Sequence, residues 1–118
     1  MELQIVEKFV KYDQDKPRMD LVPPLSTVAM AKVLAFGAKK YSPNNWRKCE
    51  SRTKYMAACL RHIFTWLSGE TTDPESGLPH LAHALCCLHF VLEMELEGLG
   101  KDDRVNVVET KTALPKEG

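Results

Sequence analysis

Two histidines in the second half of the chain have the spacing of a metal-binding pair. His80 and His83 are three residues apart in a predicted helix, so both side chains project from nearly the same face. Asp73 and Glu75 lie just before this helix and could add oxygen ligands or a general base. Together with His62 of the preceding predicted helix, they indicate a site that binds a divalent ion.

The same residues also have a purely structural interpretation. Asp73 and Ser76 could cap the following helix, and Glu75 could favour the positive end of its dipole. The histidines could be ordinary half-buried residues. Only a structure in which these side chains meet beside a cavity would favour the chemical interpretation.

Basic residues near the predicted cluster suit a ligand that carries several phosphates. Lys16 and Arg18 belong to a charged, proline-containing lead-in segment, and Arg61 belongs to the second predicted helix. Carboxylates beside such cations suit the Mg²⁺ that accompanies a polyphosphate. Ordinary surface salt bridges are the alternative.

An aromatic and amide-rich loop covers residues 41–46. Tyr41 or Trp46 could stack on a base, and Asn44 or Asn45 could read its edge. We expect this loop at the opposite end of the subunit from the histidines, where it would reach the phosphate site of a partner in an antiparallel dimer. Anchoring of Trp46 in the core is equally compatible with the sequence.

Three predicted helices must position these residues, over about 24–40, 51–68 and 76–97. Proline starts the first, Ser51 can cap the second, and glycines at 98 and 100 end the third. Short connections make consecutive helices antiparallel neighbours. We therefore expect the start of the first helix, the end of the second and the start of the third to meet.

Apolar periodicity identifies the expected core. A leucine stripe in the third helix is predicted to be buried, and it consists of Leu81, Leu85, Leu88 and Leu92. The first helix is apolar on nearly all sides, which indicates that a second subunit covers part of it. Residues 1–10 fit neither a helix nor a strand cleanly, and a short strand is possible at residues 105–108.

Composition narrows the class of protein. The chain has 118 residues, which predicts one domain over 1–118 with its core at about 11–100 and a tail at 101–118. Sixteen basic and sixteen acidic residues cancel, which argues against a polymeric nucleic acid as partner. No apolar run is long enough for a bilayer and the first twenty residues do not resemble a secretory signal, so we expect a cytoplasmic protein with reduced thiols.

Three ordered segments carry a family resemblance. They are DKPRMDLVPP, FGAKKYSPNNW and RHIFTWLSGETTDPESGLPHLAHALCCLHFVLE, within residues 11–93. The chain resembles the phage and bacterial dATP/dGTP diphosphohydrolase family, which is grouped with the MazG-like all-α nucleoside triphosphate pyrophosphohydrolases. The resemblance implies an all-α, MazG-like helical bundle, completed by assembly into a homodimer or homotetramer. If the chain is phage-encoded, it would act in the host cytoplasm.

The implied reaction converts a purine nucleoside triphosphate, with dGTP, dATP and GTP as the candidates, to the monophosphate and pyrophosphate. It uses Mg²⁺ or Mn²⁺ and shapes the nucleotide pool. Familiar MazG enzymes hold their metals with an EExxE helix followed by an ExxD helix, whereas the second predicted helix here contains no Asp or Glu. His80 and His83 are then candidates for the place of the ExxD pair.

The resemblance therefore assigns roles as expectations. The expected metal ligands are Glu70, Asp73, Glu75, His62, His80 and His83. The expected catalytic residues are Glu75, His83 and Arg61. The expected substrate-binding residues are Lys16, Arg18, Lys39, Lys40, Tyr41, Asn45 and Trp46.

Two classes compete with this enzyme. One is a nucleotide-binding protein without turnover. The other is a phage protein that binds a host partner through an exposed apolar patch, for which the helix at 24–40 is the candidate.

Overall fold

The structure is a computed structural model that describes residues 7–108. Residues 7–22 and 23–108 belong to two separate units. The described part of the first unit contains one turn of 3₁₀ helix, η1 (Met19–Leu21), and an ion pair between Arg18 and Asp20 at 2.8 Å. Residues 1–6 and 109–118, which include part of the predicted tail, lie outside the described residues.

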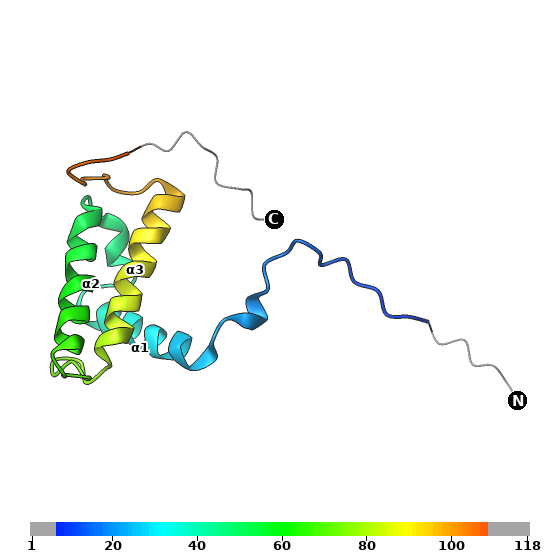
Figure 1. The fold of residues 1–118 in the computed structure, drawn as a ribbon, viewed down its shortest axis with the longest axis horizontal. Coiled ribbons are helices and arrows are strands. Elements are labelled where there is room, and N and C mark those ends of the chain that lie inside the picture. Colours follow the sequence, from blue (N-terminus) through cyan, green and yellow to red (C-terminus); the bar gives the residue numbers. More distant parts are fainter. Residues whose placement is uncertain (1–6, 109–118) are drawn as a thin grey trace, which may run out of the picture. The chain divides into compact units, whose positions relative to one another are not determined.

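Residues 23–108 form a helical unit with three α-helices and one 3₁₀ helix (Figure 1). These are α1 (Pro24–Lys40), η2 (Asn45–Lys48), α2 (Arg52–Leu67) and α3 (His80–Glu97). The predicted all-α class and the bounds predicted for the first two helices are confirmed, whereas the third helix begins at His80 and not at about residue 76. The short strand predicted at residues 105–108 is wrong, because only isolated bridges at other positions occur in the described residues. None of the described helices could cross a membrane.

Helix boundaries follow local signals with one exception. Pro24 occupies the first turn of α1, and Gly98 ends α3 with a φ of 73°. Ser51 precedes α2, but its hydroxyl does not cap the helix. The side chain of Asp103 does so from a distant position, since it accepts hydrogen bonds from the backbone N–H of Thr53 and from both neighbouring hydroxyls. These bonds hold the pKa of Asp103 well below its usual value.

Helices α2 and α3 form the main packed pair, and α1 packs against α3. The predicted meeting of the start of α1 with the start of α3 is wrong. The last residue of α1, Lys40, forms an ion pair with Glu75, just before α3. The connection from α1 to α2 then follows α3, where Trp46 stacks on Phe90 and Arg47 pairs with Glu97. Because this connection lies along α3, α2 packs against α3 and not against α1, so α1 and α2 are not antiparallel neighbours.

Small residues fill the interface between the helices. Cys59 of α2 packs with Ala84 and Cys87 of α3, while Val33 of α1 packs with Ala82 and Cys86. All four cysteines are free. Burial raises the pKa of Cys86 to about 12 and that of Cys87 to about 11, which keeps both thiols protonated at neutral pH.

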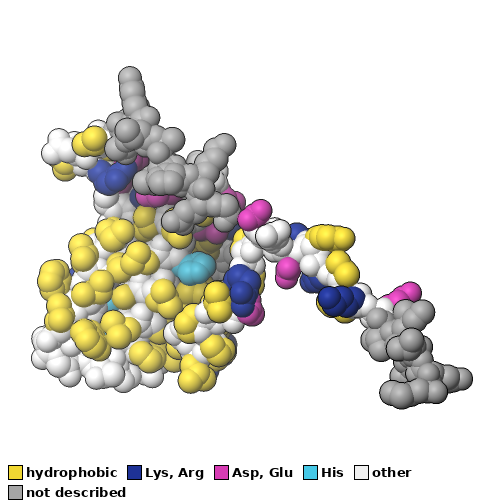
Figure 2. All heavy atoms as spheres, turned by 45° about the vertical axis from the view of Figure 1, so that its right-hand side comes forward, with side chains coloured by type: hydrophobic (Ala, Val, Ile, Leu, Met, Phe, Trp, Pro, Cys, Tyr) yellow, Lys and Arg dark blue, Asp and Glu magenta, His cyan; other side chains and the backbone are white. Residues whose placement is uncertain are grey.

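The leucine stripe of α3 is exposed, contrary to the prediction. Leu81 is 47% exposed, Leu88 44% and Leu92 55%, and Leu85 is also exposed. The neighbouring helices cover the opposite face instead, because its alanines and cysteines allow close approach. The exposed apolar surface therefore includes α3 and is not limited to α1, and Figure 2 shows hydrophobic side chains over much of one face of the helical unit.

Candidate functional site

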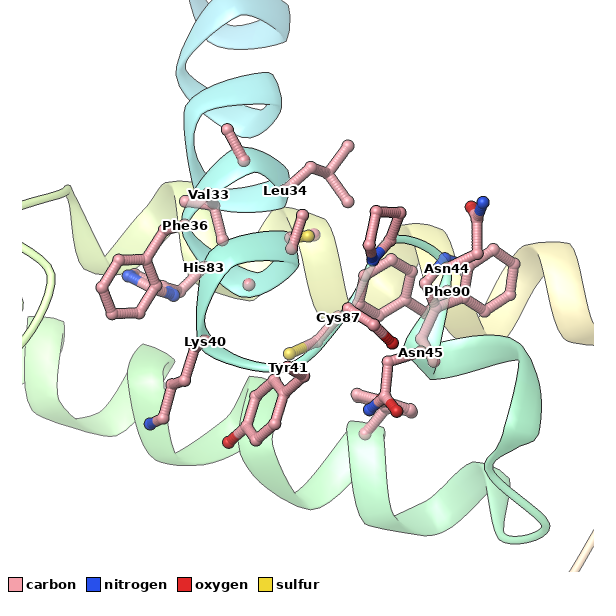
Figure 3. A pocket seen from close by; sticks show the side chains of 18 of the residues that line it. Val33, Leu34, Phe36, Lys40, Tyr41, Asn44, Asn45, His83, Cys87 and Phe90 are labelled. Carbon is pink, nitrogen blue, oxygen red and sulfur yellow. The ribbon is translucent and has the colours of Figure 1, made fainter.

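A cavity of about 580 Å³ lies among the C-terminal half of α1, the following loop, and helices α2 and α3 (Figure 3). Its polar lining includes Lys40, Tyr41, Asn44, Asn45, His62, Asp73, Glu75 and His83. The aromatic loop and the histidine cluster thus share one cavity within one subunit. The prediction that they lie at opposite ends is wrong. The C-terminal end of α1, and not its start, lies beside the start of α3.

A chain of hydrogen bonds joins Glu70, His80 and His62. His80 is only 4% exposed, and its Nε2 lies 2.8 Å from Oε1 of Glu70. Its Nδ1 lies 2.9 Å from Nδ1 of His62. A carboxylate can only accept, so Nε2 of a neutral His80 donates to Glu70 and its Nδ1 accepts from His62. This pattern leaves Nε2 of His62 without a proton.

A second chain joins Asp73, Ser76 and His83. The Ser76 hydroxyl lies 2.8 Å from Oδ2 of Asp73 and 2.6 Å from Nε2 of His83. If the hydroxyl donates to the carboxylate, Nε2 of a neutral His83 donates to the serine oxygen, and Nδ1 remains unprotonated. The sequence does not indicate this contact of a serine hydroxyl with a histidine. In this arrangement the Ser76 proton points to Asp73, so Ser76 orients His83 and is not activated as a nucleophile.

Asp73 and Ser76 have a structural role, but it is not the predicted capping of the third helix. Neither side chain caps α3. Asp73 accepts from the backbone N–H of Ser76 at 3.1 Å, and Ser76 Oγ accepts from the N–H of Leu78 at 3.1 Å. The two residues stabilise the turn before α3 and at the same time fix the orientation of His83.

The rings of His62 and His83 stack, with centroids 4.6 Å apart and planes 10° apart. Burial lowers the pKa of both histidines, and neighbouring imidazoles lower it further. Among the described residues every buried side-chain nitrogen or oxygen has a hydrogen-bond partner, so the unpaired nitrogens of these rings must reach solvent. Since both residues line the cavity, it contains two neutral imidazoles able to accept a proton.

Two carboxylates on the cavity wall differ in their surroundings. Burial alone would raise the pKa of Asp73, but hydrogen bonds from Ser76 and the nearby histidines lower it on balance. Asp73 is therefore ionised at neutral pH. Glu75 is more exposed and pairs with Lys40, whose pKa the carboxylate raises.

Several predicted site residues lie elsewhere. Arg61 and Lys39 are exposed and do not belong to the cavity lining. Lys16 and Arg18 belong to the separate unit, so the structure does not place them at the cavity. Of the predicted phosphate-binding cations, Lys40 is the one that the described residues bring to the cavity wall.

The predicted metal ligands form hydrogen bonds rather than a coordination shell. Within residues 7–108 no three His, Cys, Asp or Glu side chains group so as to hold a metal ion by themselves. A Mg²⁺ ion that is bound through substrate phosphates needs only one or two protein carboxylates. Asp73 and Glu75 on the cavity wall fit this mode of binding.

Sequence reasoning missed the apolar part of the lining. Phe36 of α1 meets the edge of His83, with centroids 6.4 Å apart, and Cys86, Cys87 and Phe90 of α3 form another part of the wall. Their apolar character indicated only that they belong to the core. Nothing in their spacing indicated that they would enclose a cavity.

The fold and the cavity define an all-α protein with a histidine- and carboxylate-lined binding site. Residues 7–104 match the model of the family described as "dATP/dGTP diphosphohydrolase, N-terminal", and the chain belongs to this family, as the motifs predicted. It is 34% identical over 95 residues to a dATP/dGTP diphosphohydrolase of Salmonella phage PMBT28. The match covers 80% of this chain but 32% of that relative, so the chain spans about a third of the relative's length. No solved structure matches.

Proposed function

We propose that the cavity binds a purine deoxynucleoside triphosphate and that the protein cleaves it between the α and β phosphates. The stacked pair of neutral histidines beside the ionised Asp73 carries this proposal, because it combines proton acceptors with an anionic group in one cavity. A volume of about 580 Å³ is typical of small-molecule sites. The name of the phage relative supports the choice of dATP or dGTP, and GTP is a further candidate.

In this proposal the phosphates occupy the polar part of the cavity. Lys40 would neutralise phosphate charge, while Asp73 and Glu75 would hold the Mg²⁺ or Mn²⁺ that accompanies the substrate. The ion supplies charge neutralisation and polarises the phosphoryl group. Arg61 and Lys39, which lie off the cavity wall, have no role in it.

His62 is the proposed proton acceptor for the attacking water. Glu70 and His80 hold its ring and direct its unprotonated Nε2 away from the hydrogen-bonded chain. Glu75, the predicted general base, is assigned to the metal ion in this proposal. We therefore transfer the role of base to His62 and leave His83 to position the substrate.

The exposed leucines of α3 support assembly with a second copy. Their 4–3–4 spacing is that of a coiled-coil seam, and the seam itself contains no charge that would repel an identical surface. We propose a homodimer, and two such dimers can associate into a homotetramer. Either assembly would cover the stripe in a cytoplasmic enzyme that shapes the nucleotide pool.

The activity is tested with purified protein and each deoxynucleoside and ribonucleoside triphosphate, with Mg²⁺ or Mn²⁺, followed by anion-exchange separation of the products. Monophosphate and pyrophosphate from dATP or dGTP are expected. Phosphate or triphosphate as product would indicate a different bond and reject the proposed reaction. Nucleotide-dependent thermal stabilisation without products would favour a binding module, a second candidate consistent with the chain matching only about a third of the relative.

A further inference from the structure

We infer that Tyr41 is the side chain that stacks on the nucleotide base, and that Trp46 anchors the loop structurally. This inference rests on the proposed function, because it concerns the same cavity. Both rings line the cavity, and the sequence does not distinguish between them.

Two groups already lie against the Trp46 ring, and the residue is only partly exposed. Phe90 stacks on it with centroids 4.8 Å apart and planes 11° apart, and the guanidinium of Arg47 lies over the ring at 4.7 Å. Arg47 is held there by two hydrogen bonds to Glu97, each 3.0 Å long. A base that stacked where either group lies would have to displace the Phe90 contact or this ion pair, which disfavours Trp46 as the stacking ring.

Phe90 makes the anchoring role of Trp46 stronger. Its ring also meets the edge of Tyr55 at 5.1 Å, which links the loop to α2 and α3 together. Such an aromatic cluster stabilises the position of η2 beside the cavity. Trp46 therefore shapes the cavity wall without contacting the base by its face.

Tyr41 has the opposite environment. Its side chain belongs to a residue that is 64% exposed, directly after the last turn of α1. The described residues provide no aromatic partner for its ring, and its recorded neighbour is the Lys40 ammonium at 5.4 Å from the centroid. The ring can therefore receive a planar base, and the same Lys40 lies where the phosphates would begin.

The neighbouring asparagines differ in direction. In Figure 3 the amide of Asn45 lies on the side of the cavity where Tyr41 is found, whereas the amide of Asn44 points away from it. Asn44 has a φ of 61° and makes the turn that brings η2 back towards α3. An amide offers both a donor and an acceptor to a base edge. We therefore assign edge contacts to Asn45.

The test compares two ligands in the presence of Mg²⁺ by isothermal titration calorimetry. One is α,β-methylene-dATP, which has a base and resists cleavage at the bond in question, and the other is inorganic tripolyphosphate. The variants are Tyr41→Leu, which removes the ring, and Tyr41→Phe, which keeps it. Circular dichroism confirms that each variant is folded.

Tyr41→Leu should weaken the nucleotide about tenfold or more and leave tripolyphosphate affinity unchanged, as expected for the loss of one stacked base. Tyr41→Phe should keep wild-type affinity for both ligands. Trp46→Leu should lower the melting temperature and weaken both ligands alike. An unchanged nucleotide affinity in Tyr41→Leu, or a selective loss in Trp46→Leu, would overturn the assignment while the proposed function stands.

Failure of the proposed function gives a different result. If the wild-type protein binds neither ligand and cleaves no nucleoside triphosphate, both the function and the stacking assignment are rejected. Binding of both ligands with equal affinity would reject a base subsite alone.

Discussion

The Nδ1 atoms of His62 and His80 lie 2.9 Å apart, so one of them must donate a proton to the other. The contact of His80 Nε2 with Glu70 decides the direction for neutral rings, because the carboxylate can only accept. His80 therefore donates to Glu70 and accepts from His62, so Glu70 fixes which nitrogen of His62 carries the proton. The hydrogen-bonded chain from Glu70 through His80 to His62 leaves Nε2 of His62 able to accept a proton.

Replacement of His62 by Gln should lower the rate of hydrolysis by about 10²- to 10⁴-fold, the range for loss of a general base. Binding of α,β-methylene-dATP should change little, since the phosphate and base contacts remain. Steady-state rates and calorimetry measure the two effects separately. His89→Gln is the matched control, because His89 is an exposed histidine of the same protein outside the proposed machinery. Equal rates in His62→Gln and wild type would remove His62 from the mechanism.

The histidine pair should make the fold sensitive to acid. Burial lowers the pKa of His62 and His83 in the folded state, so below about pH 6.5 the unfolded chain binds protons more readily. The contribution of the two neutral histidines to folding stability is complete above that pH. It is lost as the pH falls towards their lowered pKa values in the folded protein. His80, Asp73 and Glu70 also face the pair, and the lowered pKa of Asp73 keeps it ionised throughout this interval. The melting temperature should therefore fall between about pH 7.5 and 5.5.

The control for the acid effect is the double variant His62→Gln with His83→Gln, which removes both titrating rings. Its melting temperature should depend less on pH over the same interval. A wild-type melting temperature that stays constant or rises on acidification would contradict the assigned shifts.

A charge in the leucine stripe should break the proposed assembly. Leu88 is 44% exposed at the middle of the stripe, so Leu88→Glu would place carboxylates opposite each other in a symmetric pair. Light scattering after size exclusion should show a dimer or tetramer for wild type and a smaller species for the variant. Val105→Glu serves as the control, since Val105 is 97% exposed and lies outside the helices. A monomeric wild type would reject assembly through this surface.

Gly100 should tolerate no larger side chain. Its φ is 69°, and an added Cβ would lie 2.6 Å from Cε of Met94 and 3.0 Å from the backbone oxygen of Cys49. Gly100→Ala should destabilise the protein by about 1–3 kcal/mol, because it combines strain with a close contact. Chemical denaturation measures the loss. Gly37 lies within α1, and an added Cβ there would meet no atom within 4 Å. Gly37→Ala should therefore be neutral or stabilising.

The sequence by itself determined the helices, the family and part of the site. Proline and glycine signals act over a few residues, so α1 begins at Pro24, and α2 and α3 end next to Gly69 and Gly98. Because α2 and α3 are consecutive and antiparallel, the end of α2 lies beside the start of α3, and His62 meets His80 and His83. These features depend on neighbours along the chain.

Only the tertiary structure decided which faces are covered and what shares the cavity. Helix α3 has a face of leucines and a face of small residues, and the second is buried because close approach of α1 and α2 outweighs the larger area of the leucines. The position of Tyr41 beside the histidines, the role of Asp103 at α2 and the contact of Ser76 with His83 likewise depend on packing. The physical reason is that each of these features depends on contacts between segments far apart in the sequence. A local sequence pattern gives no information on such contacts.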